Sequence, residues 1–170
     1  EGYFDEYYVE MGYNVLINYY PPIATDGLKT NKWSFSPHTD YGSFTLLSQD
    51  SLGGLQVRNS AGTWIDVPPV ENAFVVNLGD LMAMWTNDLY ASTLHRALNV
   101  ANVARISIPF FVSPNPNSLI KTLPTCEDAD HPSKYPPVKA GEHLRKLIEQ
   151  ADQTGQAGIS ENTATRLKQG

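Results

Sequence analysis

His38 and Asp40, one residue apart, and His95 farther along the chain have the side chains needed to bind a metal ion. Residues i and i+2 of an extended segment point to the same side, so His38 and Asp40 project together. Two imidazoles and one carboxylate form the open three-ligand face that holds non-heme Fe(II), although Mn(II) and Zn(II) accept the same donors. A His-x-Asp pair alone often arises by chance. The combination with His95 predicts a metal site and favours iron.

Arg105 and Ser107 share one face of a predicted strand and follow His95 closely. A guanidinium pairs with a carboxylate in fork fashion, and a hydroxyl adds a hydrogen bond, so the pair could hold one end of a diacid. Taken alone, Arg105 would more often form a surface ion pair. A plain hairpin would leave about 5 Å between His95 and Arg105, too little for a five-carbon diacid. A crossing between facing sheets gives about 10 Å, so we predict such a crossing.

The elements that must position these residues are predicted to be mainly β-strands. Short apolar, β-branched or aromatic runs are separated by turn signals such as Gly53-Gly54 and Gly79-Asp80, a pattern typical of a sandwich or barrel. Asn18 and Tyr20 should share one strand face, with Tyr19 pointing the other way into packing. The predicted strands cover residues 14–20, 34–38, 43–49, 54–58, 63–67, 73–77, 92–98 and 104–112.

The two ends of the chain have a different character. Residues 1–12 are interpreted as the end of a helix, and residues 114–137 as a proline-rich irregular segment. An amphipathic helix is predicted near the C-terminus, and Ser160 could cap a second short helix. The remaining histidines, His131 and His143, are expected to be solvated. The apolar positions of the predicted helix are Leu144, Leu147, Ile148 and Ala151.

Composition limits the possible partners and settings. A chain of 170 residues is long enough for one domain with a real core. Its net charge of -6 argues against nucleic acid or an anionic membrane as the main partner. Its single cysteine, Cys126, excludes an internal disulfide and a cysteine-based zinc site. No signal peptide is visible in the given residues, and none of their apolar runs is long enough to span a membrane, so we expect a reducing, cytoplasmic setting.

Six segments in order and at compatible spacing make the chain similar to a known family. The chain resembles the catalytic core of the Fe(II)/2-oxoglutarate-dependent dioxygenases, in the branch that includes isopenicillin N synthase. The resemblance covers roughly residues 10–115 and implies a double-stranded β-helix, or jelly roll, with flanking helices. The segments are Asn18-Tyr19-Tyr20-Pro21-Pro22, His38-Thr39-Asp40, Gly53-Gly54-Leu55-Gln56-Val57, Asn77-Leu78-Gly79-Asp80, Leu94-His95-Arg96 and Arg105-Ile106-Ser107.

The resemblance implies a division of the chain and a role for each site residue. Residues 1–12 would end an N-terminal helical region, 13–115 would form the jelly-roll core, and 116–170 would pack on that core. Gly53-Gly54 and Gly79-Asp80 are interpreted as turns, and Arg96 as structural. The implied ligands are His38, Asp40 and His95 for Fe(II), and Arg105, Ser107, Tyr20 and Asn18 for 2-oxoglutarate.

The implied reaction uses O2 and 2-oxoglutarate, which becomes succinate and CO2, to hydroxylate, desaturate or cyclise a small organic molecule. No protein general base is expected beyond the metal ligands. Phe111 is the preferred substrate-contacting residue because it shares the strand face of Arg105. Tyr41, Phe44 and Trp85 are also considered, although core packing explains any one of these aromatic residues as well.

Three other functions stay open at this point. A relative with the same fold could be an Fe(II) oxidase that does not use 2-oxoglutarate. The chain could also be an inactive fragment or a non-catalytic binding module. Members of the family carry a longer N-terminal region, and the given sequence begins with Glu1 rather than Met. A zinc hydrolase is the weakest alternative, because no residue is evidently placed as its general base. The expected partner is a small molecule, with no nucleic acid or membrane.

Overall fold

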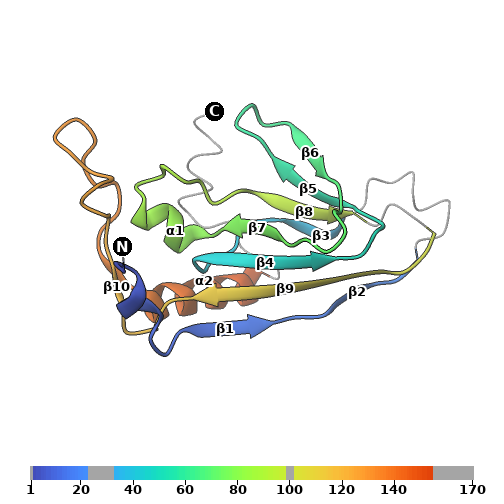
Figure 1. The fold of residues 1–170 in the computed structure, drawn as a ribbon, viewed down its shortest axis with the longest axis horizontal. Helices are drawn as coiled ribbons and strands as arrows, with labels where there is room; N and C mark the ends of the chain where they lie inside the picture. The colour runs from blue at the N-terminus through green and yellow to red at the C-terminus, as the bar shows by residue number, and fades with distance from the viewer. Residues whose placement is uncertain (1, 23–32, 99–101, 155–170) are drawn as a thin grey trace.

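The computed structural model describes residues 2–22, 33–98 and 102–154, in which most strands form two antiparallel sheets (Figure 1). Sheet A has the order β1-β9-β4-β7, with β2 also pairing with β9. Sheet B has the order β3-β8-β5-β6, and a small third sheet joins β10 to β11. The strands are β1 (Gly12–Val15), β2 (Asn18–Tyr20), β3 (Trp33–His38), β4 (Phe44–Gln49), β5 (Leu55–Arg58), β6 (Trp64–Val67), β7 (Val75–Leu78), β8 (His95–Leu98), β9 (Arg105–Ser113), β10 (Leu119–Ile120) and β11 (Val138–Lys139).

The mainly β prediction is confirmed, but the single strand expected over residues 14–20 is wrong. It is interrupted, so that β1 ends at Val15 and β2 begins at Asn18. Val15 pairs with Phe110 and Asn18 pairs with Ser107, which places the interruption opposite Ile108 and Pro109. A proline has no N–H to donate to a neighbouring strand, so the bonding here is reduced to the N–H of Leu16, which donates to the carbonyl of Pro109 at 3.2 Å.

The predicted crossing between sheets is confirmed. β8, which begins at His95, belongs to sheet B, whereas β9, which begins at Arg105, is a central strand of sheet A. Along β9 the side chains alternate: Arg105 and Ser107 are buried, and Ile106 and Ile108 are exposed on the other face. The alternation follows from the two-residue period of a strand, and it turns both polar residues toward the interior.

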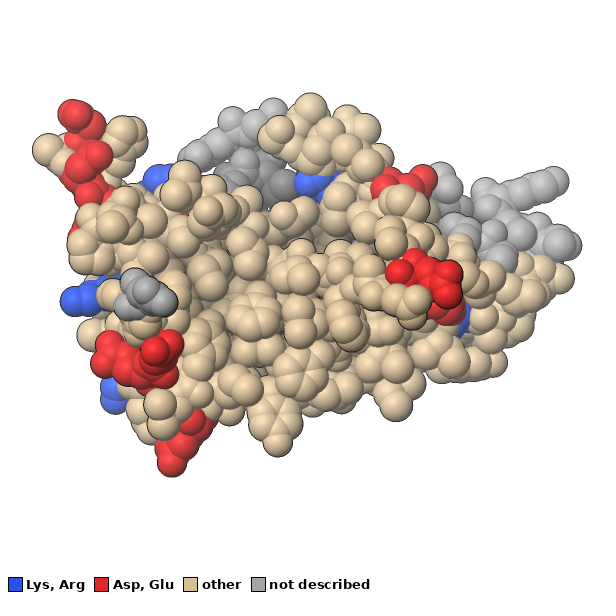
Figure 2. Space-filling view, viewed as in Figure 1, with Lys and Arg blue, Asp and Glu red and all other residues tan. Residues whose placement is uncertain are grey.

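The outer face of sheet A is apolar and exposed. Tyr19 lies on this face, 62% exposed, so the expectation that it points into packing is wrong. Figure 2 shows no charged side chain at the centre of the face, while acidic and basic groups gather toward its ends. Its strand residues include Tyr13, Val15, Tyr19, Val76, Ile106 and Ile108, each at least 37% exposed.

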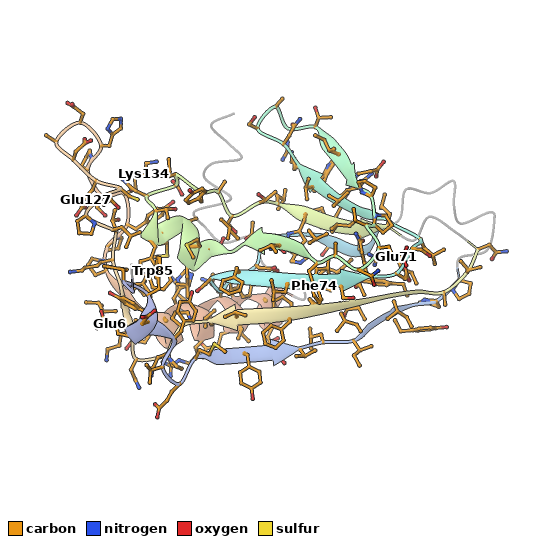
Figure 3. The ribbon with its side chains drawn as sticks, viewed as in Figure 1. Glu6, Glu71, Phe74, Trp85, Glu127 and Lys134 are labelled. Atoms are coloured by element: carbon orange, nitrogen blue, oxygen red, sulfur yellow. The ribbon has the colours of Figure 1, made fainter. Side chains whose placement is uncertain are left out.

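A buried aromatic cluster closes one end of the sheets. It is built around Trp85 in the short helix α1 (Asp80–Trp85), which the sequence analysis did not predict beyond a turn at Gly79-Asp80. Figure 3 shows Trp85 beside the N-terminal segment, where its ring contacts Phe4 and Tyr7 at centroid distances of 5.2 Å. The helix end expected within residues 1–12 is the four-residue 3-10 helix η1 (Asp5–Tyr8). Leu81, Met84, Ile120 and Ala140 complete the cluster.

The predicted C-terminal helix is confirmed as α2 (Ala140–Thr154), in which Leu147 is buried. Ser160 lies outside the described residues. His131 is exposed as expected, but His143 on α2 is half-buried, so the expectation that it is solvated is wrong. Burial lowers the pKa of His143 to about 4, and the nearby charge of Lys146 acts in the same direction. Among the described segments, no helix combines the length and apolar character needed to cross a membrane.

Candidate active site

The structure brings His38, Asp40 and His95 together, with one ligand atom of each within 4.8 Å of the others. His38 ends β3 and His95 begins β8, and the two residues face each other in the antiparallel register. Oδ1 of Asp40 lies 3.8 Å from Nε2 of His38 and 3.7 Å from Nε2 of His95. Two atoms that each bind one ion at about 2.0–2.2 Å are at most about 4.4 Å apart, so the two separations from Oδ1 fit a shared metal ion.

Both imidazoles are held by the ring nitrogen that faces away from Asp40. Nδ1 of His38 lies 2.9 Å from the carbonyl oxygen of Ser36, and Nδ1 of His95 lies 3.0 Å from that of Thr93. A carbonyl only accepts hydrogen bonds, so each Nδ1 carries the proton and donates it. Each Nε2 is therefore left with a lone pair that can bind a metal, and the ring orientation is fixed by the backbone.

The environment keeps His38 neutral. Burial and the neighbouring His95 lower its pKa to about 4, while the Ser36 carbonyl and Asp40 act in the opposite direction. The two rings lie 4.2 Å apart between centroids, so two positive charges there would repel strongly. At neutral pH the His38 lone pair is available without displacement of a proton, as a metal ligand requires.

The backbone around Asp40 is held by α1. The N–H of Asp80 donates to the carbonyl of Asp40 at 2.8 Å, and the N–H of Leu81 donates to that of Gly42 at 3.1 Å. A side chain at Gly79 would collide with the carbonyl oxygen of Gly42, so only glycine permits this close approach. The short helix thus fixes the loop that carries the carboxylate.

Two residues not predicted as functional hold the Asp40 carboxylate itself. Thr45 Oγ1 donates to Oδ2 of Asp40 at 2.5 Å, and Asn77 Nδ2 donates to the same oxygen at 2.7 Å. The donors come from β4 and β7 of sheet A, whereas His38 and His95 come from sheet B. Asp40 is 6% exposed and therefore depends on these charge-assisted hydrogen bonds.

Arg105 is almost fully buried, at 1% exposure, and its guanidinium is oriented by two neighbours. Its Nε donates to the carbonyl of Gly53 at 2.5 Å, and its central carbon lies 4.9 Å from the centre of the Tyr20 ring. Gly54 must be glycine, because a Cβ there would collide with the carbonyl oxygen of Leu98. The Gly53-Gly54 turn predicted from sequence is therefore also what supplies an acceptor to the arginine.

One part of this guanidinium lacks a partner. Among the described residues, no hydrogen-bond partner is present for Nη1 of Arg105, although the atom is buried. Tyr20 is the register partner of Arg105, and Ser107 follows Arg105 on the same face of β9. The hydroxyl oxygens of Tyr20 and Ser107 lie 3.4 Å apart. Leaving a buried charged donor unpaired is costly, so this group of atoms is suited to an anionic ligand such as a carboxylate.

A single cavity joins the two clusters. It is lined by all three predicted metal ligands and by the four residues expected to hold 2-oxoglutarate. Phe111 also lines it, whereas Trp85 belongs to the aromatic cluster and Phe44 lies beside Tyr8. Residues that the sequence analysis did not select for this cavity include Leu16, Phe35, Thr45, Leu47, Asn77 and Pro109.

Comparison with known proteins agrees with this geometry. The profile of the family described as the 2OG-Fe(II) oxygenase superfamily matches residues 12–114, which is more than half of the chain. The chain belongs to the 2OG-Fe(II) oxygenase superfamily. The matched region contains every residue of the two clusters described above.

Relatives of this chain occur in fungi and plants. It is 43% identical over 134 residues to the 2-oxoglutarate-Fe(II) type oxidoreductase hxnY of Emericella nidulans, covering 78% of this chain and 38% of the relative. The structure of a full-length Neurospora crassa protein in complex with alpha-KG and thymine has a TM-score of 0.82 at 37% identity, covering 88% of this chain and 47% of the other. The chain thus spans less than half the length of either protein.

A third comparison involves a structure that contains the metal. The structure of JOX2 in complex with 2OG, Fe and JA has a TM-score of 0.78 at 31% identity, and it covers 93% of this chain and 44% of that protein. At this identity the likeness extends beyond the fold alone. The alternative of a zinc hydrolase has no support among these relatives.

Proposed function

We propose that this chain is the catalytic core of an Fe(II)- and 2-oxoglutarate-dependent oxygenase that acts on a small organic molecule. His38, Asp40 and His95 would hold the iron. Arg105 and Ser107, with Tyr20 and Asn18, would hold 2-oxoglutarate. When bound, the iron supplies the O2 chemistry that couples decarboxylation of 2-oxoglutarate to oxidation of the substrate.

The observation that carries the proposal is that one cavity contains both an open three-ligand cluster and an unpaired buried arginine nitrogen, as judged among the described residues. A ligand that chelates a metal with one end and carries a carboxylate at the other satisfies both. A diacid with a 2-oxo group has these two features. The protein's part is to orient this co-substrate: Gly53 and Tyr20 hold the guanidinium in place, and the Ser107 hydroxyl adds a donor.

The fold and the division of the chain are proposed on the same basis. Two antiparallel sheets whose inner faces line one cavity support a double-stranded β-helix, or jelly roll. The family match over residues 12–114 supports a core at 13–115. Residues 1–12 and 116–170 would then flank it, and Ala140 at the start of α2 already belongs to the buried cluster around Trp85.

The substrate would enter beside Phe111 and Phe35. Phe111 lies on the inner face of β9 with Arg105, and Phe35 lies at the mouth, 37% exposed, with its ring 4.6 Å from that of His38. The cavity volume is about 80 Å³, well below the ~300–1,000 Å³ of typical small-molecule sites. We therefore expect the substrate site to extend beyond this cavity. Among the relatives, the Neurospora crassa protein has been observed with thymine and JOX2 with JA.

The experiment that tests this function is an anaerobic titration of the Fe(II)-loaded chain with 2-oxoglutarate, followed by visible absorption. We expect a weak charge-transfer band as the 2-oxo acid chelates the metal. Arg105→Ala should weaken 2-oxoglutarate binding by about 10- to 100-fold, since it loses a charge-assisted pair worth about 1.5–3 kcal/mol. Arg105→Lys should also bind more weakly, because a point charge does not replace the fork.

The titration also separates the alternatives. Iron binding without the band would favour an Fe(II) oxidase of the same fold. A band whose 2-oxoglutarate dependence is unchanged in Arg105→Ala would contradict the role proposed for Arg105. Absence of iron binding would contradict the proposal and favour a non-catalytic module. Arg58→Ala is a matched control, because Arg58 bonds to the carbonyl of Gly62 in a β-turn outside the cavity.

A further inference from the structure

We infer that Thr45 and Asn77 are positioning residues that make Asp40 a one-oxygen metal ligand. The inference rests on the proposed function, since it concerns how the same cluster would hold its metal. Their hydrogen bonds occupy one carboxylate oxygen, Oδ2, and leave Oδ1 directed at the two imidazoles. Three features of the described residues support it.

The first feature is that both donors reach the same oxygen. Thr45 Oγ1 and Asn77 Nδ2 lie 2.5 Å and 2.7 Å from Oδ2 of Asp40, which are short distances for such bonds. Thr45 and Asn77 are direct partners in the β4–β7 register, so their side chains emerge next to each other on one sheet face. A cross-strand pair of this kind forms a rigid fork of donors.

The second feature is the different environment of the other oxygen. Oδ1 of Asp40 lies 3.8 Å and 3.7 Å from the Nε2 atoms of His38 and His95. These distances are too long for hydrogen bonds, and both nitrogens offer lone pairs rather than protons. The carboxylate is thus divided into an oxygen that is already bonded and an oxygen that faces two other electron-pair donors.

The third feature is that the fork joins the two sheets. Asp40 lies just beyond β3 of sheet B, while Thr45 and Asn77 belong to sheet A. The terminal torsion of an aspartate is broad, so an unrestrained carboxylate would rotate and offer either oxygen or both. With Oδ2 held, the carboxylate would offer only Oδ1 to a metal ion and would leave room for a chelating co-substrate and O2.

The test uses variants that change the hydrogen bonds with little change in volume. Thr45→Val removes the hydroxyl, Thr45→Ser keeps it, and Asn77→Leu removes the amide donor. Thr63→Val is the matched control, because Thr63 is exposed in the turn before β6. The affinity of each chain for Mn(II) is measured without oxygen by competition with a chelator, and the visible spectrum is recorded with Co(II), whose absorption reports the coordination sphere.

We expect Thr45→Val and Asn77→Leu each to lower Mn(II) affinity by about 10- to 100-fold and to change the Co(II) spectrum. Thr45→Ser and Thr63→Val should match the wild type in both measurements. If Thr45→Val does not fold, as judged by circular dichroism of the metal-free protein, Asn77→Leu and Asn77→Ala carry the test, since Asn77 is only half-buried.

Two results would overturn the inference. One is wild-type Mn(II) affinity and Co(II) spectrum in the Asn77 variants. The other is a loss in Thr45→Ser with wild-type values in Thr45→Val, which would show that the methyl group and its packing matter rather than the hydroxyl. Failure of the wild-type chain to bind either metal has a different meaning, because it contradicts the proposed function itself and the inference falls with it.

Discussion

The predicted metal site differs from another polar cluster, formed by Asn87, Asp88, Lys134 and Tyr135, in whether the polar atoms have hydrogen-bond partners. In the Asn87 cluster the Asn87 amide donates to the carbonyls of Cys126 and Pro132, and its oxygen accepts the N–H of Lys134. Asp88 accepts from the Lys134 ammonium at 3.3 Å and the Tyr135 hydroxyl at 2.7 Å. The bonded groups join the end of α1 to the segment that follows β10.

The metal site instead leaves its key atoms facing one another without protons between them. The two Nε2 atoms and Oδ1 of Asp40 converge, and Nη1 of Arg105 is buried without a partner among the described residues. Such an arrangement lowers the stability of the folded chain, because buried polar groups normally have partners. The contrast indicates that paired polar clusters hold the fold together, whereas convergent unpaired atoms mark the place where a ligand belongs.

The largest effect is expected when a residue that would bind the metal is removed. His38→Ala and Asp40→Ala should each abolish stoichiometric Fe(II) binding and turnover, because two remaining ligands hold the ion poorly. Metal content after anaerobic loading and gel filtration measures the loss. Asn87→Ala should keep the wild-type iron stoichiometry. Full iron occupancy in either ligand variant would contradict the assignment of the site.

A smaller effect, on stability rather than on metal binding, is expected from a substitution in the Asn87 cluster. Asn87→Ala should lower the free energy of unfolding by about 1–3 kcal/mol, since it leaves carbonyl groups without their donor. Asn87 also has a φ of 51°, in the left-handed region that alanine tolerates less well than asparagine. Denaturant unfolding of the metal-free protein measures the change, with Asn59→Ala in an exposed turn as a control. An unchanged unfolding midpoint would show that the cluster does not stabilise the fold.

The smallest expected effect concerns pH, and it compares His38 in the metal site with His143 on α2. The pKa values of both are lowered to about 4, mainly by burial. Between the ordinary histidine pKa of about 6.5 and the lowered value, these histidines are protonated in the unfolded chain but neutral in the folded chain. The free energy of unfolding therefore falls as the pH drops from about 6.5 to about 4. His143→Gln should reduce this slope and leave Mn(II) affinity unchanged. The same slope in the variant and the wild type would show that His143 does not contribute.

The sequence predicted the parts of the site that depend on spacing along one strand. His38 and Asp40 are separated by a single residue, and so are Arg105 and Ser107. The two-residue period of a strand alone places each pair on a common face. The crossing between sheets followed from the length of a diacid. These inferences were possible because each rests on local geometry or on the size of a ligand.

The parts that sequence reasoning missed depend on which strands become neighbours. Thr45 and Asn77 act together only because β4 and β7 pair in one register, and nothing within either strand marks that partnership. The carbonyl of Gly53 orients Arg105 across a large sequence separation. The half-burial of His143 likewise arises from packing that the periodicity of α2 does not specify.

The interruption opposite Pro109 has a consequence for how this edge of the sheet can vary. β2 carries Asn18 and Tyr20 opposite Ser107 and Arg105, so its alignment with β9 would determine the geometry of the proposed 2-oxoglutarate site. β1 continues the same register on β9, and its Tyr13 and Val15 side chains lie exposed on the outer face. Between the two strands the N–H of Leu16 donates to the carbonyl of Pro109 at 3.2 Å, and Leu16 lines the cavity. A residue gained or lost in the interruption would therefore shift either β1 or the cavity wall, so the length of this short segment is constrained from both sides.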